Sequence, residues 1–307
     1  MPGRMSHTEI RDHLTGPIAS IRTPFKKNGE MDFDGLRRYL DFVIDAGSKT
    51  VLLTHGDSLY SILNEQEIAE ITKITVDHTA NRAMVCAATG MWPTRQTVAF
   101  AEYCVETGVD ILMALPPDWG GSLTTESIVT YFGTVGKILP VMLVTNFLIP
   151  RGADRGIDVV EAVRDRVPEV AAVKDDFCGE FGRRLSMAVH DSWAVFTGGQ
   201  KQNHIAVHHL GCDGYLSSFI TFKPEIAHSY WGFIQSGNID EASRIIREYD
   251  IPLFSHLKPI AGGFDAGFHG IYELIGLYNR WRRPPYHSLT DPQMDELESM
   301  CETLGIL

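Results

Sequence analysis

The chain has 307 residues, of which 44% are hydrophobic, and its 39 acidic and 27 basic residues give a formal net charge of −12. This length allows one large domain or two ordinary ones, each with a sizeable buried core. The negative charge argues against nucleic acid or an anionic membrane as the main partner, although a local site can still bind a small anion.

Cysteine usage and the N-terminus indicate where the protein resides. The five cysteines are odd in number and form no CxxC pair, which argues against a disulfide framework or a structural zinc site. The opening "MPGRMSHTEIRDH" lacks the apolar core of a signal peptide, and no stretch reaches the length of an apolar membrane span. We therefore expect a cytoplasmic protein.

Short apolar runs alternate with helix-like segments along most of the chain. Their spacing of about 20 to 33 residues is typical of repeated β-α units around a parallel sheet. The predicted strands are residues 17–21, 50–54, 83–88, 110–115, 140–145, 170–174, 194–198 and 214–218.

The segments between these runs carry apolar residues at helical spacing. In 34–46, Leu36, Leu40 and Val43 lie on one face, and Gly47 follows as a stop signal. Eight such repeats without a linker predict a (β/α)8 barrel. A doubly wound open sheet is the main alternative, but no GxGxxG dinucleotide loop follows a strand. Further helices are expected at 65–79, 94–107, 127–139 and 156–167.

The pattern changes near the C-terminus. Beyond residue 237 the strand-like runs stop, and three segments with helical character follow at 240–249, 267–281 and 292–304. We therefore divide the chain into an N-terminal segment (1–15), a barrel (16–237) and a C-terminal helical region (238–307). The sequence leaves open whether the last region is a separate domain.

The barrel prediction also locates the site, because active sites of parallel barrels lie at the carboxyl ends of the strands. Lys174 is the one lysine that the predicted strand ends place there. Residues at these strand ends and in the loops that follow, together with the nearby Arg151, are the candidate site residues: Thr54, His55, Gly56, Ser58, Thr145, Asn146, Arg151, Lys174, Gly198 and Leu216.

Lys174 ends the apolar strand in "EVAAVKDDF". Partial desolvation favours the neutral amine of a lysine, which can attack a ketone and form a Schiff base. Asp176 opposes this if it points inward, whereas strand alternation places Asp175 on the other face. The residues alone also permit a rim lysine that is solvated or paired with Asp176.

Several motifs together resemble the dihydrodipicolinate synthase/N-acetylneuraminate lyase group of class I aldolases and lyases. They span residues 16–305 and read "TPFKKNGEMDFDGLRRYLDFVIDAG", "PEVAAVKDD", "VFTGGQ", "LGCDGYLSSFITFKPEI" and "RRPPY". The resemblance implies a (β/α)8 barrel with three C-terminal helices, assembled as a homo-oligomer, either a dimer or a tetramer. It also implies that Lys174 forms the Schiff base.

The function implied by this resemblance is that of a lyase without cofactor or metal. Its substrate is pyruvate or a 2-keto (sugar) acid, and the reaction is aldol cleavage, aldol condensation or dehydration. Two alternatives stay open: dihydrodipicolinate synthase itself, or a barrel that binds a keto acid without the usual catalysis. His204 and His208 are one helical turn apart, but no third metal ligand is evident.

Two of the departures from the family pattern concern the chemistry of the site. The Tyr-Asn pair expected after strand five is Thr145-Asn146, and an aliphatic hydroxyl can relay a proton or orient water but cannot act as an acid near pH 7. The expected carboxylate-binding loop Gly-Thr-Thr-Gly-Glu is replaced by "LTHGDSLYS". There Gly56 is the natural anchor, and either Thr54 or Ser58 supplies a hydroxyl.

The missing tyrosine raises the question of which group moves the proton. We hypothesise that His55 replaces it, because imidazole titrates near neutrality. A loop histidine bonded to backbone is the alternative, and Tyr60 is a second candidate. Arg151, after strand five, is expected to bind a second carboxylate or a sugar-acid hydroxyl, unless it is a solvated loop charge.

Overall fold

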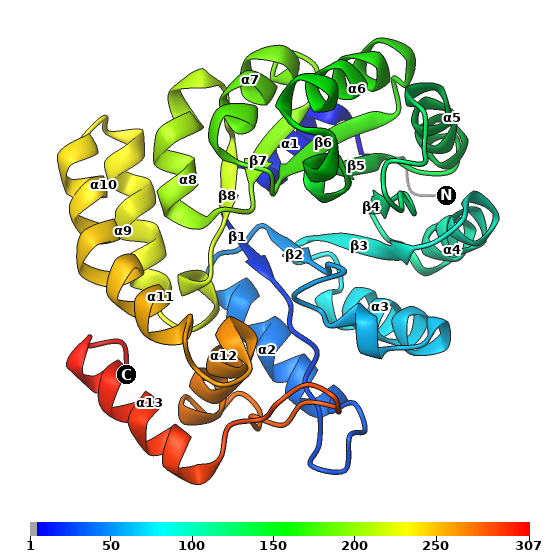
Figure 1. The fold of residues 1–307 in the computed structure, drawn as a ribbon. Coiled ribbons are helices and arrows are strands. Elements are labelled where there is room, and N and C mark those ends of the chain that lie inside the picture. The colour runs from blue at the N-terminus through cyan, green and yellow to red at the C-terminus, as the bar shows by residue number, and fades with distance from the viewer. Residues whose placement is uncertain (1–4) are drawn as a thin grey trace.

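The computed structural model describes residues 5–307, so the first four residues of the predicted N-terminal segment lie outside the described residues. Within this range, eight parallel strands close into a barrel in chain order, with β1 pairing to both β2 and β8 (Figure 1). The prediction of a (β/α)8 barrel is confirmed. The strands are Gly16–Ser20 (β1), Thr50–Leu52 (β2), Met84–Met91 (β3), Ile111–Leu115 (β4), Val141–Val144 (β5), Val170–Asp175 (β6), Ala194–Thr197 (β7) and Gly214–Leu216 (β8).

Helices alternate with the strands and surround the barrel (Figure 1). Polar caps define several of their starts: Asp32 accepts from the backbone N–H of Gly35, and Asn64 accepts from that of Glu67. The barrel helices are Phe33–Asp45 (α2), Glu65–Thr79 (α3), Thr94–Thr107 (α4), Thr125–Gly136 (α5), Ala153–Arg166 (α6), Gly179–Val189 (α7), Gln200–Val207 (α8) and Pro224–Gln235 (α9).

The chain ends differ from the prediction in three ways, one of which is that α11 (Ile251–Leu257) lies where no helix was predicted. Helix α1 (His7–Leu14) lies in a segment for which no helix was predicted, although Ser6 and Glu9 form a capping box that is readable from sequence. The predicted helix 267–281 is α12 (Gly263–Leu274), which ends before Gly276, a residue with a left-handed φ of +75°. The remaining C-terminal helices are Ile239–Ile245 (α10), Ile251–Leu257 (α11) and Asp291–Thr303 (α13).

The C-terminal helices pack against the barrel. Tyr272 of α12 lies against Tyr39 of α2, with ring centroids 4.9 Å apart. Lys201 of α8 and Asp250 form a fully buried ion pair of 2.8 Å, and Asp250 belongs to a π-helical turn, Ile246–Asp250, between α10 and α11. Among residues 5–307, no helix has both the length and the apolar character needed to cross a membrane.

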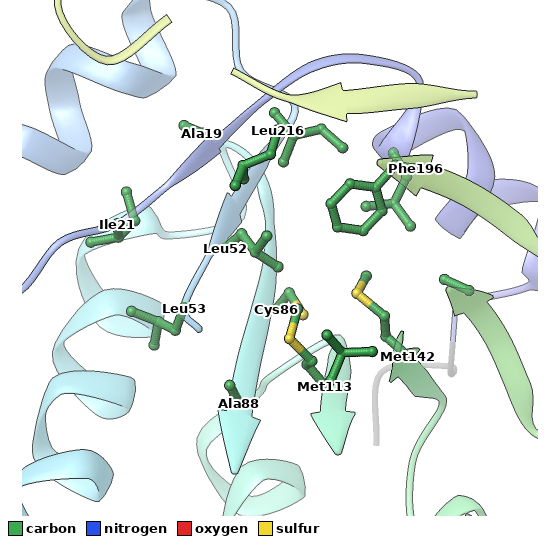
Figure 2. Close-up of a cluster of buried hydrophobic side chains, with 14 of the residues drawn as sticks. Ala19, Ile21, Leu52, Leu53, Cys86, Ala88, Met113, Met142, Phe196 and Leu216 are labelled. Atoms are coloured by element: carbon green, nitrogen blue, oxygen red, sulfur yellow. The ribbon is translucent and has the colours of Figure 1, made fainter. Parts of the chain in front are cut away.

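The barrel interior is filled by side chains and is not a channel. Figure 2 shows Cys86, Met113, Met142 and Phe196 pointing toward one another between the strands, and all four are buried. Met113 also lines the cavity above the barrel, as do Ala88 and Leu216. The uppermost layer of the core therefore forms the cavity floor.

Candidate active site

A cavity of about 500 Å³ opens at the carboxyl ends of the strands. Its walls come from β3, β4, β5, β6 and β8 and from the loops that follow β2, β4, β5, β6 and β7. The volume lies in the range that small-molecule sites occupy. The position is where a parallel barrel carries its chemistry.

Lys174 lies at the end of β6, in register with Val144 of β5 and Phe196 of β7. Its side chain is 7% exposed, it lines the cavity, and its Nζ forms an ion pair with the carboxylate of Asp176. Both side chains need the space left by Gly198. A Cβ there would collide with Asp176 and lie 2.9 Å from the Lys174 Nζ.

Asp175 points away from Lys174, as strand alternation predicts. Its Oδ1 accepts from the backbone N–H groups of Phe177 (3.1 Å) and Cys178 (3.0 Å). Burial raises the pKa of Asp175. The two adjacent aspartates therefore have different partners, since Asp175 holds the loop between β6 and α7 and Asp176 contacts the lysine.

Thr145 is fully buried and does not line the cavity. Its Oγ1 accepts from the backbone N–H groups of Asp176 (2.9 Å) and Phe177 (3.0 Å) and donates to Asp175 Oδ1 (3.3 Å). The predicted proton relay through Thr145 does not match this geometry, because its hydroxyl is hydrogen-bonded to the segment 175–177 and does not reach the cavity. Thr145 instead fixes the loop that carries Asp176.

The loop after β2 supplies several of the predicted residues. Thr54 and Gly56 line the cavity, and the Thr54 Oγ1 accepts from the backbone N–H of Asp57 (2.9 Å). Ser58 is fully buried outside the cavity lining, where its Oγ donates to the carbonyl of Ile21 (2.6 Å). Of the two candidate hydroxyls, the structure therefore brings Thr54 and not Ser58 into the site.

His55 lines the cavity, and its Nδ1 is buried without a hydrogen-bond partner among residues 5–307. Burial lowers the pKa of His55, so the ring is neutral at neutral pH and can accept a proton. Tyr60 is buried outside the cavity lining, and burial raises its pKa further above the neutral range. The structure therefore favours His55 over Tyr60 as a titrating group.

Asp57 and Arg22 form a charged pair that the sequence did not identify. The Arg22 Nη2 lies 3.6 Å from Asp57, and its Nε lies 3.3 Å from Asp265 of α12. Burial would raise the pKa of Asp57, but the nearby Arg22 brings it below its ordinary value. The pair connects one wall of the cavity to the C-terminal helices. The signal available in the sequence was the carboxylate of Asp57, which follows His55 by two residues.

Arg151 is engaged outside the cavity. Its Nε donates to Asp118 Oδ2 (3.0 Å), and its Nη2 donates to the carbonyl of Leu123 (2.6 Å). Asp118 lines the cavity, but Arg151 does not. The structure therefore does not present Arg151 to a second carboxylate, because its guanidinium holds the loop between β4 and α5 instead.

The remaining predicted residues do face the site. Asn146 lines the cavity with an exposed side chain, and Leu216 lines it from β8. The structure thus brings seven of the ten candidates together, leaving out Thr145, Ser58 and Arg151. Among residues 5–307, no group of three or more His, Cys, Asp or Glu side chains is placed to hold a metal ion.

The fold and the cavity define a (β/α)8 barrel with a buried lysine at the end of its sixth strand. Residues 13–304 match the model of the dihydrodipicolinate synthetase family, and the chain belongs to this family. The prediction of a lyase of this family is confirmed, since its members include enzymes named as lyases and dehydratases.

Two relatives illustrate the range of activities. A 4-hydroxy-tetrahydrodipicolinate synthase from Dechloromonas aromatica is 27% identical over 238 residues, covering 76% of this chain and 79% of its own. A Streptomyces avermitilis protein named "Probable 5-dehydro-4-deoxyglucarate dehydratase 2" is 27% identical over 300 residues, covering 94% of this chain and 86% of its own.

Solved structures share the fold at lower sequence identity. N-acetylneuraminate lyase from Fusobacterium nucleatum superposes with a TM-score of 0.83 at 17% identity, covering 95% of this chain and 99% of its own. A prophage protein of the dihydrodipicolinic acid synthase family from E. coli K12, solved in complex with pyruvate, gives 0.82 at 23% identity with the same coverage. At these sequence identities, the structural similarity shows a shared fold and nothing further.

Proposed function

We propose that the protein is a Schiff-base lyase in which Lys174 condenses with the ketone of pyruvate or a longer 2-keto acid. The observation that carries this proposal is the buried Lys174 Nζ, which faces a cavity large enough for a small molecule and contacts Asp176. The amine attacks C2, water leaves, and the protonated imine withdraws electrons from the neighbouring carbon. This permits aldol cleavage, aldol condensation or dehydration.

Asp176 is suited to the proton transfers of this sequence. The Lys174 ammonium must lose a proton before it can attack, and the carboxylate in contact with it can accept that proton. Once the imine has formed, Asp176 remains next to the reacting atoms. The neutral ring of His55 is a second base in the same cavity. Both replace a family tyrosine that this chain lacks.

The loop after β2 is suited to holding the carboxylate of the keto acid. Within residues 5–307, the backbone N–H groups of His55 and Gly56 donate no hydrogen bond to the protein. Gly56 leaves open space where a side chain would stand, which lets an anion approach its backbone. Lys174 would then bind the ketone carbon of the 2-keto acid, and this loop would bind its carboxylate.

Reductive trapping tests the proposal. Borohydride transfers hydride to the imine carbon and converts it to a stable secondary amine, so pyruvate should add one adduct to the peptide that contains Lys174, detected by mass spectrometry. Lys174→Arg should give no adduct, and Lys223→Arg, a lysine outside the cavity lining, should react like the wild type. Absence of an adduct in the wild type with pyruvate and with longer 2-keto acids contradicts the proposal.

Turnover separates an enzyme from a protein that only binds keto acids. Adduct formation without cleavage, condensation or dehydration of any tested keto acid would favour the binding protein. A protein that only binds keto acids is a reasonable alternative because Thr145 lies where the family tyrosine is expected and its hydroxyl is outside the cavity. The homo-oligomeric assembly implied by the family stays a prediction.

A further inference from the structure

The cavity has two chemically different halves. One half is polar and is built by the loop after β2 and by the ends of β6 and β7, with Thr54, His55, Asp57, Lys174 and Asp176. The other is built by β3, β4, β5 and the segments that follow them. Its wall is mostly apolar and is formed by Met91, Met113, Leu115, Pro116, Val144 and Phe147.

Polar atoms on the apolar half are largely occupied by the protein itself. The Thr89 Oγ1 accepts from the backbone N–H of Leu115 (3.0 Å). Asp118 accepts from Arg151 through one carboxylate oxygen and from the backbone N–H of Leu123 (2.9 Å) through the other. Asn146 is the polar side chain of this wall that has no hydrogen-bond partner within residues 5–307. This half therefore offers a substrate one polar contact and much apolar surface.

The charges of the cavity also favour a particular kind of substrate. Among residues 5–307, Lys174 is the one cationic side chain in the cavity lining, against the carboxylates of Asp57, Asp118 and Asp176. The protonated imine keeps this positive charge at Lys174, where Asp176 and the keto-acid carboxylate lie beside it. Within the lining formed by residues 5–307, a second carboxylate at the far end of the substrate would therefore have no cation to pair with, which is costly in a partly desolvated site.

We propose that the part of the substrate beyond the keto-acid group is uncharged and mainly apolar, with at most one hydroxyl for Asn146. The keto-acid end binds at Lys174 and the loop after β2, and the tail lies along the methionine-containing wall of β3 and β4. This deepens the proposed function and rests on imine formation by Lys174. It excludes dicarboxylates and polyhydroxylated sugar acids as preferred substrates.

A matched pair of keto acids tests whether the part of the substrate beyond the keto-acid group is apolar. 2-Oxohexanoate and 2-oxoadipate have the same six-carbon chain, and the terminal methyl of the first is a carboxylate in the second. The initial rate of borohydride-trapped adduct at Lys174 is measured against the concentration of each. We expect the half-saturating concentration of 2-oxohexanoate to be at least about 10-fold lower, in line with the discrimination that apolar pockets achieve.

A rim substitution should shift this preference. Met91 lines the cavity but is 59% exposed, so Met91→Arg adds a cation to the apolar wall without filling the core. We expect it to shift the trapping ratio toward 2-oxoadipate by about 3- to 5-fold, as for a partly exposed ion pair. Met187→Arg is the matched control, because Met187 is similarly exposed (64%) on α7, outside the cavity lining.

The outcomes separate this inference from the proposed function. If neither pyruvate nor any other keto acid is trapped, the proposed function fails and the inference fails with it. If pyruvate is trapped but 2-oxoadipate or a polyhydroxylated keto acid saturates at an equal or lower concentration than 2-oxohexanoate, the inference is overturned and the proposed function stands. An equal shift in Met91→Arg and Met187→Arg also overturns the assignment of the tail to this wall.

Discussion

At the scale of single residues, the site depends on the difference between two adjacent aspartates. Asp175 is the last residue of β6 and faces away from Lys174, whereas Asp176, the first residue after the strand, contacts the lysine. Asp175 accepts backbone N–H groups beneath the site, together with Thr145, whereas Asp176 forms the ion pair with Lys174. In the proposed function, this carboxylate takes over the proton transfer that the family pattern assigns to a tyrosine at position 145.

Asp176→Asn tests this role through proton exchange. With pyruvate in D2O, the imine exchanges the methyl protons of pyruvate for deuterium if a base removes them, which NMR follows directly. We expect Asp176→Asn to slow this exchange by about 100-fold or more, the usual contribution of a positioned acid–base group. The rate of borohydride trapping should be measured alongside, because it follows imine formation separately.

His55→Gln is the comparison variant, since His55 lines the same cavity while the ion pair with Lys174 is made by Asp176. A large loss of exchange in His55→Gln with little change in Asp176→Asn would assign the proton transfer to the imidazole. Comparable exchange in both variants and the wild type would remove both residues from the proton path.

At the scale of elements, a buried ion pair joins the barrel to its C-terminal helices. Lys201 of α8 and Asp250 of the π-helical turn are both 0% exposed, and the Lys201 Nζ also lies 4.0 Å from the centroid of the Phe219 ring. Burial lowers the pKa of Lys201 and raises that of Asp250, while each charge favours the ionised form of the other. Each side chain therefore depends on the charge of its partner to stay ionised while buried.

Lys201→Met should remove one charge and leave Asp250 buried without its cation. We expect the free energy of unfolding to fall by about 3–5 kcal/mol, measured by urea denaturation at pH 7. The double variant Lys201→Met with Asp250→Leu should lose clearly less than the sum of the two single variants, because no unpaired charge remains. Additive losses would show that the two side chains stabilise the junction independently.

At the scale of the whole molecule, buried histidines make stability depend on pH. His204 of α8 packs against Tyr215, with ring centroids 5.1 Å apart, and its Nδ1 lies 2.8 Å from the Tyr230 hydroxyl. Burial lowers the pKa of His204 to about 3. The unfolded chain binds a proton near the ordinary value of 6.5, so it holds more protons than the folded chain between these two values.

Stability should therefore fall as the pH drops below about 6.5, by at most about 1.4 kcal/mol per pH unit for this group. Urea midpoints at pH 7 and pH 5 measure the loss. His204→Asn should flatten this dependence in part, because His269 is also buried with a lowered pKa and acts in the same direction. His209→Asn, at an exposed position, should keep the wild-type slope, and an unchanged slope in His204→Asn would contradict the assignment.

Much of this molecule could be predicted without its tertiary structure. The eight strand-like runs lie within a few residues of the strands found, because buried parallel strands need continuous apolar residues. The helical spacing between them predicted α2 to α6, five of the eight barrel helices, because each of these helices buries one face against the barrel. Lys174 could be placed at the cavity from its position at a strand end, since a barrel brings all such ends together.

Periodicity and motifs that are local in the chain were enough to predict the barrel, its family and the lysine at its mouth. Which neighbouring polar groups face the cavity could be read from the tertiary contacts alone. Thr145, Ser58 and Arg151 are bonded elsewhere, while Asp176 and Asp57 enter the site. The directions of these side chains depend on partners such as Asp118, in the loop after β4, and Arg22, in the segment after β1, which lie far from them in sequence. A side chain's direction is set by such contacts, which local sequence patterns do not encode.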